Sequence, residues 1–167
     1  DEILVVDDAS SDGSPEFVKK TRASVLSLQQ RTGCGGAIRA GLEYGLEKDY
    51  DVFIILAGNG KDDPQEIPNL LKPLQENRAD FVQGSRYLPG GQWGNMPFHR
   101  IWGTRFYSLL FSTFLKQWIT DGTNGFRACR RSILEDPRVN FAISRLEGYS
   151  VERYLFVLSI RFGYIVL

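Results

Sequence analysis

The chain alternates short apolar runs with longer amphipathic segments. The apolar runs predict buried strands at residues 3–6, 25–28, 52–56 and 81–84. Between them, the apolar spacing and the turn residues predict helices near 15–21, 37–47 and 64–75. Strands that alternate with such helices are typical of a mostly parallel sheet with helices on both faces. The sequence therefore predicts an α/β fold.

Polar loops follow three of the predicted strands, at residues 7–13, 57–64 and 84–87. In open α/β sheets, ligands bind beyond the carboxyl ends of the strands. We therefore expect these three loops to meet around one site.

The pattern changes after Tyr87. Residues 101–119 form a helical stretch rich in Phe, Leu and Trp, and Arg105 and Lys116 interrupt it. This stretch is too broken by charge to span a membrane, so it is either a core helix or a helix whose aromatics lie in a bilayer interface.

Charge is balanced over the whole chain but not along it. The 167 residues include 20 basic and 20 acidic side chains. Residues 1–84 hold 9 basic and 15 acidic side chains, residues 85–131 hold 7 and 1, and residues 132–167 hold 4 and 4. Zero net charge argues against nucleic acid as a partner, because phosphate neutralisation usually needs a basic excess. The basic segment instead suggests a smaller anionic ligand.

The two cysteines, Cys34 and Cys129, are too few for a disulfide scaffold and lack metal-ligand spacing. They predict reduced thiols in a cytosolic setting.

Two local patterns each allow a structural and a functional interpretation. Asp7 and Asp8, at the end of the first strand, either cap a turn and a helix or hydrogen-bond to the base or ribose of a nucleotide. The glycines at 33–36 either permit close helix packing or leave helix N–H groups open to an anion such as a diphosphate.

Five stretches of the chain resemble the family-2 glycosyltransferases, which have a GT-A fold. They lie at residues 5–13, 33–41, 63–68, 84–87 and 121–127. The last two look most like the branch that contains dolichol-phosphate mannosyltransferases and bacterial polyprenyl-phosphate sugar transferases. The resemblance implies a GT-A-like catalytic domain over residues 1–167, with a nucleotide-sugar part at 1–84 and an acceptor part at 85–167. Relatives begin with a further strand, so we expect this chain to lack its first strand and to be truncated at both ends.

The resemblance implies that the nucleotide-sugar donor is bound by Asp7, Asp8, Asp12 and Gly36. The loop after the third predicted strand departs from the family. Relatives usually carry Asp-x-Asp, often followed two residues later by Gln, and these oxygens hold Mg²⁺ or Mn²⁺ against the diphosphate. Here the three places fall on Ala57, Asn59 and Lys61, which lack the carboxylates that hard cations prefer.

Three outcomes follow from this departure. Lys61, with Asn59 beside it, supplies the positive charge that the metal normally supplies to the leaving diphosphate. Alternatively, Asp62 and Asp63 hold a displaced metal, although Asp63 before Pro64 is also expected to cap a helix. Lastly, catalysis has been lost.

For the acceptor, the resemblance implies that Arg86, Arg100 and Arg127 grip the phosphate of a lipid phosphate, a task that suits arginine forks. Asp121, the one acid of the basic segment, either orients Arg127 or contacts the sugar. A general base is less needed, because an acceptor phosphate is already an anion.

The expected reaction is hexosyl transfer from a nucleotide-sugar to a polyprenyl (dolichol-type) phosphate at the cytoplasmic face of a membrane, catalysed with Lys61, Asn59 and Asp121. One alternative is a glycosyltransferase with a hydroxyl acceptor in polysaccharide synthesis, for which Asp121 would serve as base. Another is a noncatalytic module that binds nucleotide-sugar or lipid phosphate.

Overall fold

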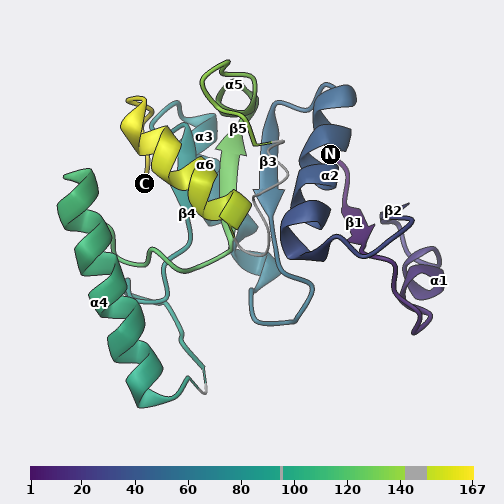
Figure 1. The fold of residues 1–167 in the computed structure, drawn as a ribbon, viewed down its shortest axis with the longest axis horizontal. Coiled ribbons are helices and arrows are strands. Elements are labelled where there is room, and N and C mark those ends of the chain that lie inside the picture. The colour runs from purple at the N-terminus through teal and green to yellow at the C-terminus, as the bar shows by residue number, and fades with distance from the viewer. Residues whose placement is uncertain (95, 142–149) are drawn as a thin grey trace.

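The computed structural model describes residues 1–94, 96–141 and 150–167 (Figure 1). The elements in chain order are β1 (Leu4–Asp7), α1 (Ser14–Val18), β2 (Ser24–Ser27), α2 (Gly33–Glu47), β3 (Val52–Ile55), the 3₁₀ turn η1 (Pro64–Glu66), α3 (Ile67–Gln75), β4 (Phe81–Gln83), α4 (Phe98–Leu115), β5 (Arg127–Arg130), α5 (Arg131–Leu134) and α6 (Ser150–Arg161).

The strands of the described residues form two sheets. β1 and β2 pair in parallel, with Val5 opposite Val25. The second sheet has the order β3-β5-β4, and β5 runs antiparallel to both neighbours. β3 and β4 therefore point the same way, as the α/β prediction requires. β5 was not among the predicted strands, and it is the antiparallel exception.

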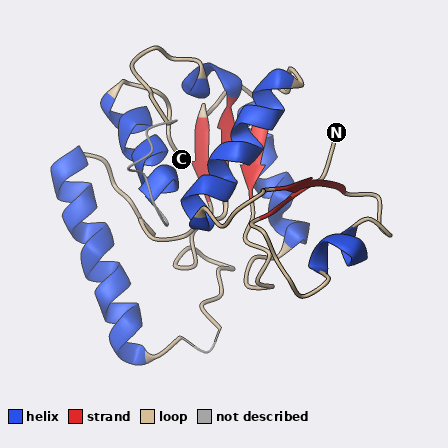
Figure 2. Ribbon diagram, turned by 45° about the vertical axis from the view of Figure 1, so that its right-hand side comes forward, coloured by secondary structure: helices blue, strands red, loops and turns tan. Residues whose placement is uncertain are grey.

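The second sheet is covered on both faces, as Figure 2 shows. Side chains alternate along its strands, so neighbouring residues face opposite layers. Phe53, Phe81 and Cys129 pack with α2 and α6, where Leu42 and Leu155 belong to the same buried cluster. The opposite face packs on α3 through a second cluster. The strand residues on that face are Ile54, Val82 and Ala128.

The structure revises the bounds of several predicted helices. α2 begins at Gly33 rather than near residue 37, so the glycines at 33–36 form its first turn. α4 begins at Phe98 and ends at Leu115, where residues 101–119 were expected. The predicted helix at 64–75 is divided into η1 and α3. Asp63 accepts a hydrogen bond from the Gln65 N–H at 2.9 Å, which confirms its predicted capping role.

Helix α4 lies apart from the sheets and from most other helices (Figure 1). Ser108 is its one buried residue. Its large apolar side chains are mostly exposed, which does not fit the core-helix alternative. The most exposed of them are Phe98, Trp102, Phe106 and Phe114. Among the described residues, no helix combines the length and apolar character needed to cross a membrane.

Candidate functional site

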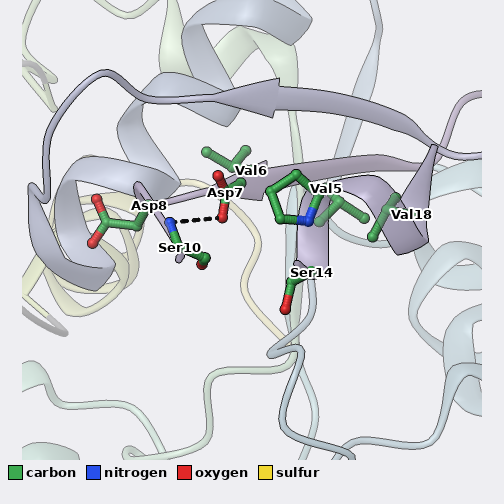
Figure 3. Close-up of a pocket in the computed structure, with 8 residues that line it drawn as sticks. Val5, Val6, Asp7, Asp8, Ser10, Ser14 and Val18 are labelled. Atoms are coloured by element: carbon green, nitrogen blue, oxygen red, sulfur yellow. Dashed lines mark hydrogen bonds between the residues drawn. The ribbon is translucent and has the colours of Figure 1, made fainter. Parts of the chain in front are cut away.

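Asp7 lines a cavity of about 290 Å³ at the end of β1 (Figure 3). Its walls include Val5, Pro15 and Val18, and its polar groups include Asp7 and Ser10. Asp7 is buried, and its Oδ1 accepts the Ser10 N–H at 3.2 Å. Apolar walls beside a few polar groups are the usual make-up of a small-molecule pocket. This cavity is the candidate nucleoside pocket.

Asp8 is used differently. Figure 3 shows its carboxylate pointing away from Ser14. Its oxygens accept the Thr32 N–H at 2.7 Å, the Thr32 hydroxyl at 3.0 Å and the Gly33 N–H at 2.9 Å. The backbone hydrogen bond from Thr32 is the main reason that the pKa of Asp8 lies below its ordinary value. The hydrogen bonds therefore support the capping interpretation of Asp8. Asp8 also lines the same cavity as Asp7, so a contact with a nucleotide stays a prediction.

Of the glycines at the start of α2, Gly36 serves close packing, whereas nothing lies within 4 Å of a Cβ at Gly33. A Cβ at Gly36 would lie 2.1 Å from Thr32 Oγ1, so no side chain fits there without displacing Thr32. The N–H groups of Thr32 and Gly33 are already bound by Asp8, so a diphosphate at this helix end would compete with a carboxylate. Asp12, exposed, accepts the Ser14 N–H at 3.0 Å in the turn before α1.

The loop after β3 does not fit a divalent cation. Asn59 Oδ1 accepts the Lys61 N–H at 3.1 Å, and Asp62 Oδ2 accepts the Ala57 N–H at 3.2 Å. Ala57 has no ligand atom, and the ammonium of Lys61 repels a cation. Asp63 caps η1. No group of three or more His, Cys, Asp or Glu side chains within the described ranges could hold a metal ion. The Mg²⁺ or Mn²⁺ typical of the family therefore lacks its donor set here.

Arg86 and Asp121 form a buried ion pair at the end of β4. Arg86 Nε and one Nη donate to the two carboxylate oxygens at 2.7 and 2.9 Å, and the same nitrogen reaches Thr123 Oγ1 at 2.5 Å. The Asp121 side chain is 0% exposed and that of Arg86 21%. Burial alone raises the pKa of Asp121, but the hydrogen bonds and charge of Arg86 outweigh it, so the pKa is lowered. Asp121 is held as a carboxylate.

Arg127 does not join Arg86. It is 2% exposed, and its guanidinium donates to the carbonyls of Asn124 and Glu152 and lies 5.5 Å from the centre of the Phe156 ring. Burial lowers its pKa to about 10. Of the two alternatives for Asp121, the structure does not fit orientation of Arg127, because the carboxylate oxygens accept from Arg86 and Thr123. A contact with the sugar stays a prediction. Arg127 ties the 121–127 segment to the start of α6.

The ring of Tyr87 lies next to two arginines, Arg86 and Arg105. The guanidinium carbons of Arg86 and Arg105 lie 5.9 and 5.0 Å from the centre of its ring, and its hydroxyl contacts Thr104. Thr104 in turn donates to the carbonyl of Arg100 at 3.0 Å. Arg100 is exposed in the first turn of α4 and forms no ion pair with the described residues. Arg86 and Arg105, which sequence reasoning did not select, therefore form one basic region at Tyr87. Arg100 is placed near it only through its backbone, one turn before Thr104 in α4.

Glu152, in the first turn of α6, is a buried acid that sequence reasoning missed. Its Oε1 lies against Gly125, where a Cβ would be 3.0 Å away. Burial raises the pKa of Glu152, and the charge of Asp62 adds to this. The pKa of Arg86 is raised mainly by its hydrogen bond to Asp121, and the charge of Asp62 raises it further. Asp62, in the loop after β3, is therefore within electrostatic range of Arg86, after β4, and of the start of α6. These are two of the three loops that were expected to share one site. An acid on the apolar face of the 150–161 segment was the available signal.

The chain belongs to glycosyl transferase family 2, whose model matches residues 1–137. It is 36% identical over 157 residues to an undecaprenyl-phosphate mannosyltransferase of Micrococcus luteus. The aligned region covers 90% of this chain and 63% of the relative. It is 32% identical over 171 residues to a polyprenol monophosphomannose synthase of Mycolicibacterium smegmatis, covering 99% and 63%. The chain thus spans less than two thirds of the length of these relatives.

Solved structures show the same fold. Glucosyl-3-phosphoglycerate synthase from Mycobacterium tuberculosis, in complex with Mn²⁺ and UDP-glucose, superposes with a TM-score of 0.69 at 23% identity. The match covers 98% of this chain and 55% of that one. The α/β architecture is therefore GT-A-like, as predicted.

Proposed function

We propose that this chain is the catalytic part of a glycosyltransferase that moves a hexosyl group from a nucleotide-sugar to a polyprenyl phosphate. The observation that carries the proposal is the basic region around Tyr87, where Arg86 is fixed by the buried Asp121 and the guanidinium of Arg105 lies over the same ring. A fixed arginine such as Arg86 suits a phosphate, because its position needs no reorganisation when the phosphate binds. The undecaprenyl-phosphate and polyprenol relatives support this choice of acceptor.

On the donor side, Asp7 and its cavity would hold the nucleoside, with Asp12 and the start of α2 beside it. Asn59 and Lys61 would face the diphosphate and sugar. Lys61 is exposed and would supply one positive charge to the leaving diphosphate. This proposal gives Lys61 the part that a cation has in other members of the family.

On the acceptor side, Arg86 and Arg100 would bind the phosphate, whose oxygen attacks the sugar carbon as the bond to the diphosphate breaks. The phosphate oxygen is already anionic, so no general base is required. Asp121 would act through Arg86, because both its oxygens are engaged and its pKa is lowered. A hydroxyl acceptor would need a free base, and this state of Asp121 argues against that alternative.

We further propose that the chain acts at a membrane surface. The exposed aromatics of α4 lie beside Arg100 and Lys116, and aromatics with basic residues are typical of helices at a bilayer interface. Flotation with vesicles containing anionic lipid should carry the protein upward, and the double variant Phe106→Ser/Phe114→Ser should remain behind. Equal flotation of both proteins would contradict this part.

The reaction itself is tested with a labelled nucleotide-sugar offered together with polyprenyl phosphate and an oligosaccharide. We expect the label in the lipid fraction. Label in the oligosaccharide would support a hydroxyl acceptor instead, and donor binding without transfer would support a noncatalytic module.

A further inference from the structure

A second cavity, of about 310 Å³, lies between α4 and the segment that follows it. Leu109, Trp118 and Ile119 form its apolar walls, and Tyr87 borders it. Ile119 is buried, whereas Leu109 and Trp118 are exposed, so the cavity runs from the interior to the surface of α4. None of the donor residues proposed above lines it.

The hydroxyl groups that line this cavity are already paired. Ser108 and Ser112 each donate to a carbonyl one turn back in α4, and they accept the N–H groups of Gly122 and Ile119, both at 2.9 Å. Thr120 donates to a serine hydroxyl of the loop after β4 at 2.8 Å. A hydroxyl has one proton to donate, so none of these three keeps a donor for a ligand. The fourth lining hydroxyl, that of Tyr87, is paired with Thr104. A sugar or a base in this cavity would find no free hydroxyl donor for its acceptor groups, at a cost in affinity.

Arg105 is the exception among the lining residues. Its guanidinium lies over the Tyr87 ring, and no carboxylate within the described ranges forms an ion pair with it. The cavity therefore presents apolar walls and one available positive charge. This combination fits an amphiphile in which a single anionic group is joined directly to an apolar chain.

We propose that this cavity holds the isoprene unit next to the phosphate of the acceptor, with Arg105 adding its charge to that phosphate. The inference rests on the proposed function and deepens it, since it names the part of the acceptor that is recognised and where. Tyr87 joins the two subsites, because Arg86 lies near the same ring. The remaining isoprene units would leave over Leu109 and Trp118 along the exposed face of α4.

Two adjacent leucines provide a matched test. Leu109 lines the cavity and is 53% exposed, whereas Leu110 does not line it and is 41% exposed. Calorimetric titration with farnesyl phosphate, without donor, measures binding of the short acceptor alone. We expect Leu109→Trp, which fills the cavity, to weaken binding about tenfold or more, and Leu110→Trp to leave it unchanged. Trp118→Ala, which removes a wall, should also weaken binding.

The charge is tested separately. Arg105→Gln should weaken binding of farnesyl phosphate but not of farnesol, and Lys116→Gln, at the other end of α4, should change neither. Equal affinity of the Leu109→Trp and Leu110→Trp variants, or no binding of farnesyl phosphate by the parent protein, would overturn the inference. These titrations need no transfer, so a protein that binds farnesyl phosphate but fails in the labelled-sugar assay would refute the proposed function and leave this cavity assigned.

Discussion

Replacing Arg86 by Gln should destabilise the fold more than replacing its partner Asp121 by Asn. Arg86→Gln leaves a carboxylate with 0% exposure and no countercharge. Removing one partner of a buried pair typically costs about 3–5 kcal/mol. Asp121→Asn leaves a guanidinium that is 21% exposed and can turn toward water, so we expect only about 1–2 kcal/mol, on the scale of lost hydrogen bonds.

The penalty should depend on pH with a definite sign. The pKa of Asp121 in the folded protein lies below its ordinary value. The pair therefore contributes stability above the ordinary carboxyl range, and this contribution is lost as the pH falls through the lowered folded pKa. In Arg86→Gln, burial without the arginine raises the pKa of Asp121, so protonation near pH 4 should relieve much of the penalty.

Urea unfolding of the parent, Arg86→Gln and Asp121→Asn proteins at pH 7 and pH 4 measures these differences directly. At pH 7, a loss of about 3 kcal/mol corresponds to a melting temperature lower by about 6–12 °C for a chain of this size. Equal losses in the two variants, or a loss in Arg86→Gln that does not shrink at pH 4, would refute the view that Asp121 is a buried carboxylate held by Arg86.

Three further predictions concern the donor side. Asp8→Ala should cost about 1–2 kcal/mol at pH 7 through loss of the α2 cap, and, because the folded pKa of Asp8 is lowered, urea unfolding near pH 3 should show a smaller difference. Gly36→Ala should cost about 1–3 kcal/mol by overpacking, and much less in a Thr32→Gly background; an unchanged cost there would contradict the contact. Lys61→Ala should lower turnover about 100-fold while the affinity for farnesyl phosphate stays the same; a parent-like rate would rule out its role at the diphosphate.

The strands that the sequence predicted correctly are those whose own residues are apolar, such as β1 and β3. β5 was not predicted because its two arginines, Arg127 and Arg130, flank only Ala128 and Cys129. This pattern looks too polar and too short for a strand at the centre of a sheet. The two arginines are accommodated because their guanidiniums donate to backbone carbonyls of other segments, Arg127 to Glu152 and Arg130 to Ala79. That compensation is tertiary and cannot be read from local pattern.

In the candidate site, too, local contacts were predictable from the sequence and long-range contacts were not. Local capping by Asp63 was predictable because donor and acceptor lie two residues apart. The early start of α2 was not, because the cap comes from Asp8, 25 residues before Gly33, and the low helix propensity of glycine pointed the other way. The partner of Asp121 was missed for the same reason, since Arg86 lies 35 residues away.

The most direct test of this account is the initial rate of sugar transfer from a labelled nucleotide-sugar to polyprenyl phosphate, measured with excess chelator and again with added Mn²⁺ or Mg²⁺. The loop of Ala57, Asn59 and Lys61 does not offer a cation its usual oxygens, so we expect labelled lipid in both conditions at rates that differ by less than about twofold, well under 1 kcal/mol in barrier. A rate that vanishes in chelator and returns with the cation would contradict the role of Lys61, and no labelled lipid in either condition would contradict the proposed function itself.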